Sequence, residues 1–353
     1  MSGVEQVFQP AARLRLRWAR LGGFSFRFRP RMLLLIGAAL ALLVILAAWA
    51  LTLGSAQLPL EAIVQALTGA GTRQADFVVL SLRLPRILSA ALVGLLLAMS
   101  GAIFQGLVRN LLASPDVIGV NAGASLAAVF WIVTRRSPEW IPLVAFLGAL
   151  SAAAAVYGLS WRGKISHSRL ILVGIGVNAL LTAGVTLLIV RAGINDVSKA
   201  YQWMTGSLYA ASWADVRLLA ITAGILAPLG VALIWWLRVM QMGDLAARSL
   251  GIPLERARLL LAVTGCGLSA AAIAAAGPIG FVALMIPHIA RMLAGPPTGG
   301  VFLLSGILGG ILLLSADMAG QHALPVGLPA GVLTAALGAP YFLFLLYRSN
   351  ARS

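Results

Sequence analysis

The sequence predicts an all-α, polytopic membrane protein with ten transmembrane helices and both termini in the cytoplasm. Of its 353 residues, 60% are apolar and only 10% are charged, and the mean hydropathy is +0.96. Several uninterrupted apolar stretches are about 20 residues long, which is the length at which a helix crosses a ~30 Å hydrocarbon layer. This composition excludes an ordinary soluble enzyme.

Ten apolar windows lie between charged or Gly/Pro-rich breaks. They run over 32–53, 85–106, 114–134, 141–160, 169–190, 215–237, 257–276, 279–294, 300–319 and 328–347. The eighth window is the shortest and contains Pro287. Because ten is an even number, both termini are expected on the same side of the membrane.

The charge distribution predicts which side that is. The formal net charge is +16, and seven arginines precede the first window: Arg13, Arg15, Arg17, Arg20, Arg27, Arg29 and Arg31. Basic segments stay on the cytoplasmic side. With the amino terminus inside, 18 of the 26 Lys and Arg residues face the cytoplasm. We therefore expect a basic cytoplasmic tail over 1–31, a permease domain over 32–348 and a short cytoplasmic tail over 349–353. Since topology explains the charge, no nucleic-acid partner is expected.

Two connections outside the windows carry their own predictions. Residues 191–214 are too polar to cross and contain rings that favour a membrane interface, Trp203, Tyr209 and Trp213. We expect a short outer helix or a re-entrant piece there. Gly277 and Pro278 leave almost no loop between the seventh and eighth windows, which predicts a tight helical hairpin.

Small residues four positions apart recur inside the windows, at Gly119 and Gly123 and again at Gly306 and Gly310. Close approach of helices in lipid needs such residues. We interpret them as packing positions rather than ligand sites.

Residues 158–164 match the first seven positions of a phosphate-binding loop, but Ile165 replaces the Ser or Thr that would hold magnesium, and the stretch ends an apolar helix. Any ATP must therefore be hydrolysed by another chain. His167, His288 and His322 lack metal-ligand spacing, and the single cysteine, Cys266, excludes an intrachain disulfide. We expect no metal, no bound cofactor and no enzymatic activity in this chain.

Asp317 is the only acid well inside an apolar window. A carboxylate there costs about 2.5–3.5 kcal/mol at a helix centre and less near a helix end, so a polar partner is expected. The alternative is a proton relay.

The loop over 238–258 has helix punctuation. Asp244 suits an N-cap, Gly251 the position after a helix, and Pro253 the first residue of the next helix. This predicts a short helix, a sharp turn and a second helix that enters the seventh window. A rigid, partly apolar knob of this kind suits docking into a groove on a partner, and the alternative is an ordinary surface helix.

Nine short segments in one order together resemble a known family. They are RLPR at 83–86, SGAIFQ at 100–105, RN at 109–110, SPDVIG at 114–119, MGD at 242–244, GPIGF at 277–281, PHIAR at 287–291, AD at 316–317 and GAPYF at 338–342. The chain from about residue 32 onward resembles the FecCD/BtuC-like permease subunits of ATP-driven (ABC) importers for ferric siderophores, haem and cobalamin.

The resemblance implies a BtuC-like permease fold in the bacterial inner membrane. It implies a second permease subunit, with a heterodimer favoured over a homodimer, two ATP-binding subunits that use ATP and Mg, and a periplasmic or lipoprotein siderophore-binding protein. The motifs are most similar to catecholate-siderophore (ferric enterobactin-type) members, so a ferric siderophore is the expected cargo. Haem or cobalamin are alternatives, and a proton-coupled secondary transporter that uses Asp317 is the alternative from another class.

The resemblance also implies roles for particular residues. Arg83 and Arg86 would dock the binding protein. The alternative is that both only anchor the end of a helix at the lipid head groups. The coupling loop over 238–256 would seat in the ATPase through Asp244, Leu245, Ala246, Arg248, Leu250 and Gly251. The cytoplasmic gate would comprise Asn110, Leu112, His167 and Ser168. Our own candidates for a weakly adhesive pathway lining are Gly174, Gly176 and Asn178. The chain departs from the family pattern at Leu111, where the family usually has proline, at Gln321, where an arginine is expected, and at Gly327, where an acidic residue is common.

Overall fold

The computed structural model describes residues 17–21, 24–28, 30–54, 56–161, 167–323 and 326–350. Within these residues the secondary structure is helical, except for an antiparallel pair of short strands, β1 (Arg17–Leu21) and β2 (Phe24–Phe28). The strands lie in the predicted basic tail. They lie outside the helical domain, and the all-α fold class is confirmed.

Each of the ten predicted windows coincides with a helix in the described part of the chain. These are α1 (Pro30–Thr52), α4 (Leu84–Val108), α5 (Val120–Val133), α6 (Ile141–Ser160), α7 (His167–Arg191), α9 (Trp213–Met240), α11 (Leu254–Ala276), α12 (Val282–Ala294), α13 (Gly299–His322) and α14 (Ala330–Asn350). Among the described residues, seven helical segments are long and apolar enough to cross a membrane, and α5, α12 and most of α14 are shorter apolar helices. The chain is a multi-pass membrane protein.

Two helices begin later than the sequence predicted. The window at 114–134 opens with a 3-10 turn, η2 (Pro115–Ile118), and α5 starts only after Gly119, whose φ is 76°. The window at 279–294 starts at Val282, because Gly277 (φ 71°) and Phe281 (φ 66°) hold the connection in left-handed conformations. Left-handed residues cannot continue a right-handed helix, so each one delays the start.

The predicted hairpin of the seventh and eighth windows is wrong. Helices α11 and α12 both pack on α4, and α12 lies against α13 rather than along α11. The connection over 277–281 separates the two helices, so α12 runs back towards the α10 end beside α4 and α13 without packing along α11. A short connection therefore does not require the two helices that it joins to be neighbours.

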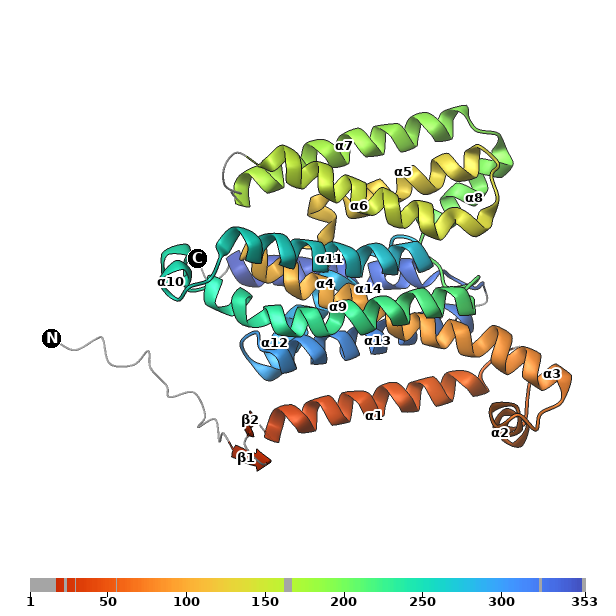
Figure 1. Ribbon diagram of the computed structural model, residues 1–353. Coiled ribbons are helices and arrows are strands. Elements are labelled where there is room, and N and C mark those ends of the chain that lie inside the picture. The colour runs from red at the N-terminus through yellow and green to blue at the C-terminus, as the bar shows by residue number, and fades with distance from the viewer. Residues whose placement is uncertain are drawn as a thin grey trace.

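Figure 1 shows the helices arranged as a bundle with two distinct ends. The short helix α10 (Asp244–Ser249) lies at one end, together with the start of α1 and the end of α14. The opposite end carries α8 (Ile194–Met204), α2 (Leu60–Thr68) and α3 (Arg73–Asp76). We call these the α10 end and the α8 end. Helix α8 confirms the short helix expected within 191–214, whereas α2, α3 and the π-helical turn η1 (Phe77–Arg83) were not predicted.

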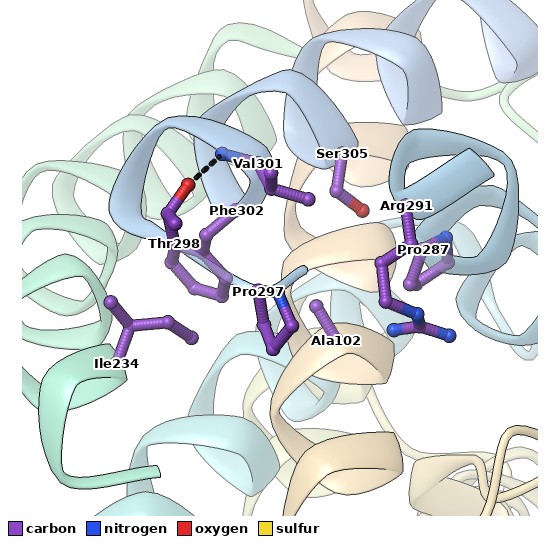
Figure 2. A pocket seen from close by; sticks show the side chains of 9 residues that line it. All are labelled: Ala102, Ile234, Pro287, Arg291, Pro297, Thr298, Val301, Phe302 and Ser305. Atoms are coloured by element: carbon purple, nitrogen blue, oxygen red, sulfur yellow. Dashed lines mark hydrogen bonds between the residues drawn. The ribbon is translucent and has the colours of Figure 1, made fainter. Parts of the chain in front are cut away.

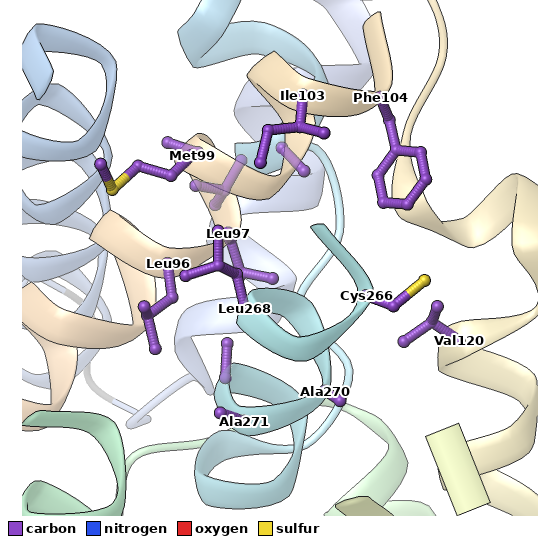
Figure 3. Packing of buried hydrophobic residues seen from close by; sticks show 14 of the residues in the cluster. Leu96, Leu97, Met99, Ile103, Phe104, Val120, Cys266, Leu268, Ala270 and Ala271 are labelled. Carbon is purple, nitrogen blue, oxygen red and sulfur yellow. The ribbon is translucent and has the colours of Figure 1, made fainter. Parts of the chain in front are cut away.

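Helix α4 is the centre of the bundle and packs against α9, α11, α12 and α13. Figure 3 shows side chains of α4 and α11 that fill this core, and Leu96, Met99, Ile103 and Phe104 are almost completely buried. Water is already absent from lipid, so such packing stabilises a membrane bundle chiefly through close van der Waals contact.

Glycines bring the backbones of neighbouring helices close together. A Cβ added at Gly123 would collide with Ala152 and with the carbonyl of Gly148, and one at Gly310 would meet the backbone of Ala91. Both contacts confirm the packing interpretation. Gly119 differs, because ordinary space surrounds it and its positive φ is what requires glycine.

Candidate functional site

The α10 end presents the predicted helix-turn-helix. Helix α9 ends at Met240, α10 follows, and α11 begins directly after Pro253. Gly251 adopts a φ of 78° just after α10 and donates its N–H to the carbonyl of Arg248 at 2.9 Å. Its predicted place is thus confirmed, whereas Gly243 is the N-cap and Asp244 the first helical residue, which corrects the capping prediction.

The knob formed by residues 242–251 is apolar on its outer side. Leu245 is 84% exposed, Met242 72% and Leu250 58%, whereas Ala247 and Ile252 are buried against the bundle. Ala246 is half-buried and Arg248 exposed. Large apolar side chains that project together from a rigid turn are typical of a surface that a partner covers.

The carboxylate of Asp244 holds the knob to the bundle. One oxygen accepts from Nη2 of Arg109 at 2.9 Å, and the other accepts from Nη2 of Arg258 at 2.7 Å. Burial alone would raise the pKa of this carboxyl, but the two guanidinium groups outweigh that effect and hold its pKa below the ordinary value. The carboxylate is therefore ionised at neutral pH, and we call this arrangement the Asp244 clasp.

Two predicted gate residues, Asn110 and Leu112, come directly after Arg109 of the clasp in the sequence. Arg109 is the C-cap of α4, and the side chain of Asn110 accepts a hydrogen bond from the backbone N–H of Leu112 at 2.9 Å, which closes a turn. Ser168 is exposed in the first turn of α7. The backbone of His167 begins that helix, but its side chain lies outside the described residues. The gate assignment stays a prediction.

The predicted lining residues of α7 do not share one face. Asn178 donates to the carbonyl of Asp116 at 3.0 Å, and a Cβ at Gly174 would collide with the carbonyl of Val117, so both pack on η2. Gly176 is exposed, with no atom near the position of a Cβ. Of the three, only Gly176 lies on an open face of this chain, and the lining role stays a prediction.

At the α8 end, the two predicted docking arginines make contacts inside the chain. Arg83 donates through Nη1 to the carbonyl of Leu51 and through Nη2 to that of Ala56, each at 2.6 Å, and so fastens the end of α1. Arg86 forms a two-pronged ion pair with Asp317, with both donor–acceptor distances 2.8 Å. Both guanidinium groups are therefore engaged within this chain, and their docking role stays a prediction.

Asp317 has the polar partner that its position required. Its side chain is 4% exposed, that of Arg86 is 18% exposed, and Gln321 donates to the same carboxylate at 2.7 Å. The guanidinium of Arg86 also lies 5.8 Å from the ring centroid of Tyr209. Gln321, where the family resemblance led us to expect an arginine, thus completes a buried network.

A second buried polar network was not predicted. Arg291 of α12 donates to the side-chain oxygen of Gln105 in α4, and the amide nitrogen of Gln105 donates to the carbonyl of Leu284 at 2.8 Å. Figure 2 shows Arg291 at the edge of a pocket lined by residues of α4, α9, α12 and α13 and of the turn before α13, where Thr298 caps that helix through the N–H of Val301. The signal in the sequence was a glutamine and an arginine within otherwise apolar windows.

Other features of the sequence gain no chemistry from the structure. Within the described residues no three His, Cys, Asp or Glu side chains gather as a metal site would require. Cys266 is a buried free thiol. Of the partial phosphate-loop match, residues 162–166 lie outside the described residues, and its start forms the last turn of a helix where that motif needs a strand.

Comparison with known proteins relates this arrangement to transporters. The chain is 41% identical over 317 residues to the achromobactin transport system permease protein CbrC of Dickeya dadantii, which covers 88% of this chain and 91% of the relative. It is 39% identical over 306 residues to the ferric enterobactin transport system permease protein FepG of Escherichia coli, with 86% and 92% covered.

A solved structure has the same fold. It is an inward-facing conformation assigned to the metal-chelate type of ABC transporter, with a TM-score of 0.81, 28% sequence identity, and coverage of 89% of this chain and 98% of that one. The model of the FecCD transport family matches residues 40–348, which is most of the sequence. The chain belongs to the FecCD transport family.

Proposed function

We propose that this chain is the permease subunit of an ABC importer that carries a ferric siderophore across the inner membrane. The observation that carries the proposal is the exposed apolar knob of residues 242–251, which the Asp244 clasp joins to the ends of α4 and α11. Such a knob needs a partner to cover it. The similarity to permeases named for achromobactin and ferric enterobactin supports the cargo.

The proposal places the α10 end in the cytoplasm and treats all ten apolar helices as membrane crossings. The excess of Lys and Arg on the segments that would then face inward supports this orientation. The short lengths of α5 and α12 are compatible with crossing because 3-10 and extended connections continue both of them, η2 before α5 and 277–281 before α12. Both termini then lie in the cytoplasm.

The energy comes from other chains. Two ATP-binding subunits hold and hydrolyse ATP with Mg, and this chain binds no cofactor and catalyses no reaction. Their closure pushes on the knob, and the helices respond by opening the pathway at one end and closing it at the other. A second permease subunit, which we propose to be a different chain, supplies the other wall of the pathway.

A siderophore-binding protein delivers the cargo at the α8 end. Arg83 and Arg86 lie there, and an arginine fork suits acidic residues on such a protein. Both guanidinium groups already donate hydrogen bonds within this chain. A docked protein would therefore bind only the N–H groups that these contacts leave over.

The rival from another class is proton-coupled transport through Asp317. The two-pronged ion pair with Arg86 and the bond from Gln321 favour a structural role instead.

One experiment tests the proposal against this rival. The chain is reconstituted in vesicles with its second permease, ATPase and binding protein, and uptake of radiolabelled ferric enterobactin and ferric achromobactin is measured with ATP, without ATP, and with only a proton gradient. We expect uptake with ATP alone and competition by neither haem nor cobalamin. Uptake that needs the proton gradient but not ATP would refute the proposal.

A further inference from the structure

The Asp244 clasp joins the knob to the three helices nearest to it. Arg109 ends α4, Arg258 lies in the second turn of α11, and Arg109 also donates to the carbonyl of Met240 at the end of α9, at 2.6 Å. The segments containing α4 and α11 are the most deeply buried of the long apolar helices. One carboxylate thus contacts the ends of the two most deeply buried long helices.

The contacts of the clasp are directional. Arg258 is 8% exposed and also reaches Glu255 at 3.2 Å, so its guanidinium is fixed from two sides. Arg109 has a φ of 55°, a left-handed conformation that is uncommon for a residue with a side chain. A planar guanidinium group held by charge-assisted hydrogen bonds fixes the relative orientation of the two groups as well as the distance between them. A displacement of Asp244 therefore displaces the ends of α4 and α11.

The same contacts reach the loop that carries two predicted gate residues. Asn110 is the next residue after Arg109, and its side chain organises the turn to Leu112. Movement of Arg109 changes the backbone from which this turn starts. The knob is in this way connected to residues 110–112 through a single side chain.

We propose that Arg109 and Arg258 are positioning residues that transmit the movement of α10 to α4 and α11 and thereby couple ATP hydrolysis to transport. The inference rests on the proposed function. A side chain that only stabilises the fold affects how much complex assembles. A transmitting side chain changes the number of ferric siderophore molecules moved for each ATP hydrolysed.

The test measures that ratio in the full reconstituted complex, with radiolabelled ferric enterobactin as cargo. The variants are Arg109→Gln and Arg258→Gln. The matched control is Arg256→Gln, because Arg256 lies two residues before Arg258 in α11, is exposed and makes no ion pair among the described residues. Loss of a charge-assisted bond is expected to lower the ratio roughly tenfold or more in both variants. The control is expected to stay within about twofold of the wild type.

Two further variants keep the test decisive if a glutamine variant assembles poorly. Arg109→Lys keeps the charge and is expected to recover most of the ratio. In an Asp244→Asn background, Arg109→Gln is expected to add little, because its partner has already been lost. Equal losses of hydrolysis and uptake, with an unchanged ratio in all variants, would overturn the inference, as would an equal loss in Arg256→Gln.

The outcome for the wild type separates this inference from the proposed function. A wild-type complex that shows no ATP-dependent uptake of ferric siderophore contradicts the proposed function itself. A wild-type complex that transports, beside clasp variants with a normal ratio, contradicts only the role of the clasp.

Discussion

The buried ion pair between Arg86 and Asp317 predicts a large and non-additive effect on stability. Asp317 is 4% exposed, and its carboxylate accepts two bonds of 2.8 Å from Arg86 and one of 2.7 Å from Gln321. Arg86→Gln leaves that charge buried without its counter-ion, which costs about 3–5 kcal/mol of unfolding free energy. Asp317→Asn leaves the guanidinium unpaired and is expected to cost a similar amount.

The double variant Arg86→Gln with Asp317→Asn removes both charges together. Two amides can still share a hydrogen bond, so its loss is expected to be at least about 2 kcal/mol smaller than the sum of the single losses. The assay is equilibrium unfolding of the purified chain in lipid nanodiscs. Arg217→Gln is the control, since Arg217 is exposed and makes no ion pair among the described residues, and it should cost below about 0.5 kcal/mol. Additive losses in the double variant would refute the coupling.

Three further predictions concern the packing, the knob and pH. Gly101→Val places a side chain against the carbonyl of Ala283, so α12 must move away from α4. The free energy of unfolding is expected to fall by more than about 2 kcal/mol. An unchanged unfolding midpoint would contradict the close approach of the two helices. Leu245→Glu puts a charge on the most exposed apolar residue of the knob; co-purification with the ATPase should fall about tenfold or more while the thermal midpoint stays near that of the wild type, and undiminished co-purification would remove Leu245 from the interface. The pKa of Asp244 is depressed in the folded chain, so its contribution to stability is complete above the ordinary pKa of about 4 and is lost as the pH falls through the lower folded pKa. The ratio of uptake to hydrolysis should therefore be constant from pH 5 to 8. A decline of this ratio centred near pH 6 would contradict the ionised clasp.

The sequence predicted the knob well because local chemistry determines it. Gly251 stops the short helix through its positive φ, and apolar Leu245 and Leu250 have no place in a charged surface loop unless a partner covers them. The position of Asp244 was predicted within one residue, but its predicted N-cap role was wrong. Whether an acidic residue caps a helix or binds an arginine 135 residues away along the chain depends on tertiary contacts.

What the sequence by itself determined is the class of protein, the number of apolar helices and the family motifs, since each depends on composition and on short-range order. Only the tertiary structure decided which charges meet. Arg86 and Asp317 are 231 residues apart, and no periodicity relates them. It also decided that α12 packs beside α4 and α13 instead of pairing with α11. Lipid solvates every apolar helix face about equally well, so hydrophobicity does not select which helices pack together. Small residues and buried polar pairs make that selection, and they come together only when the bundle assembles.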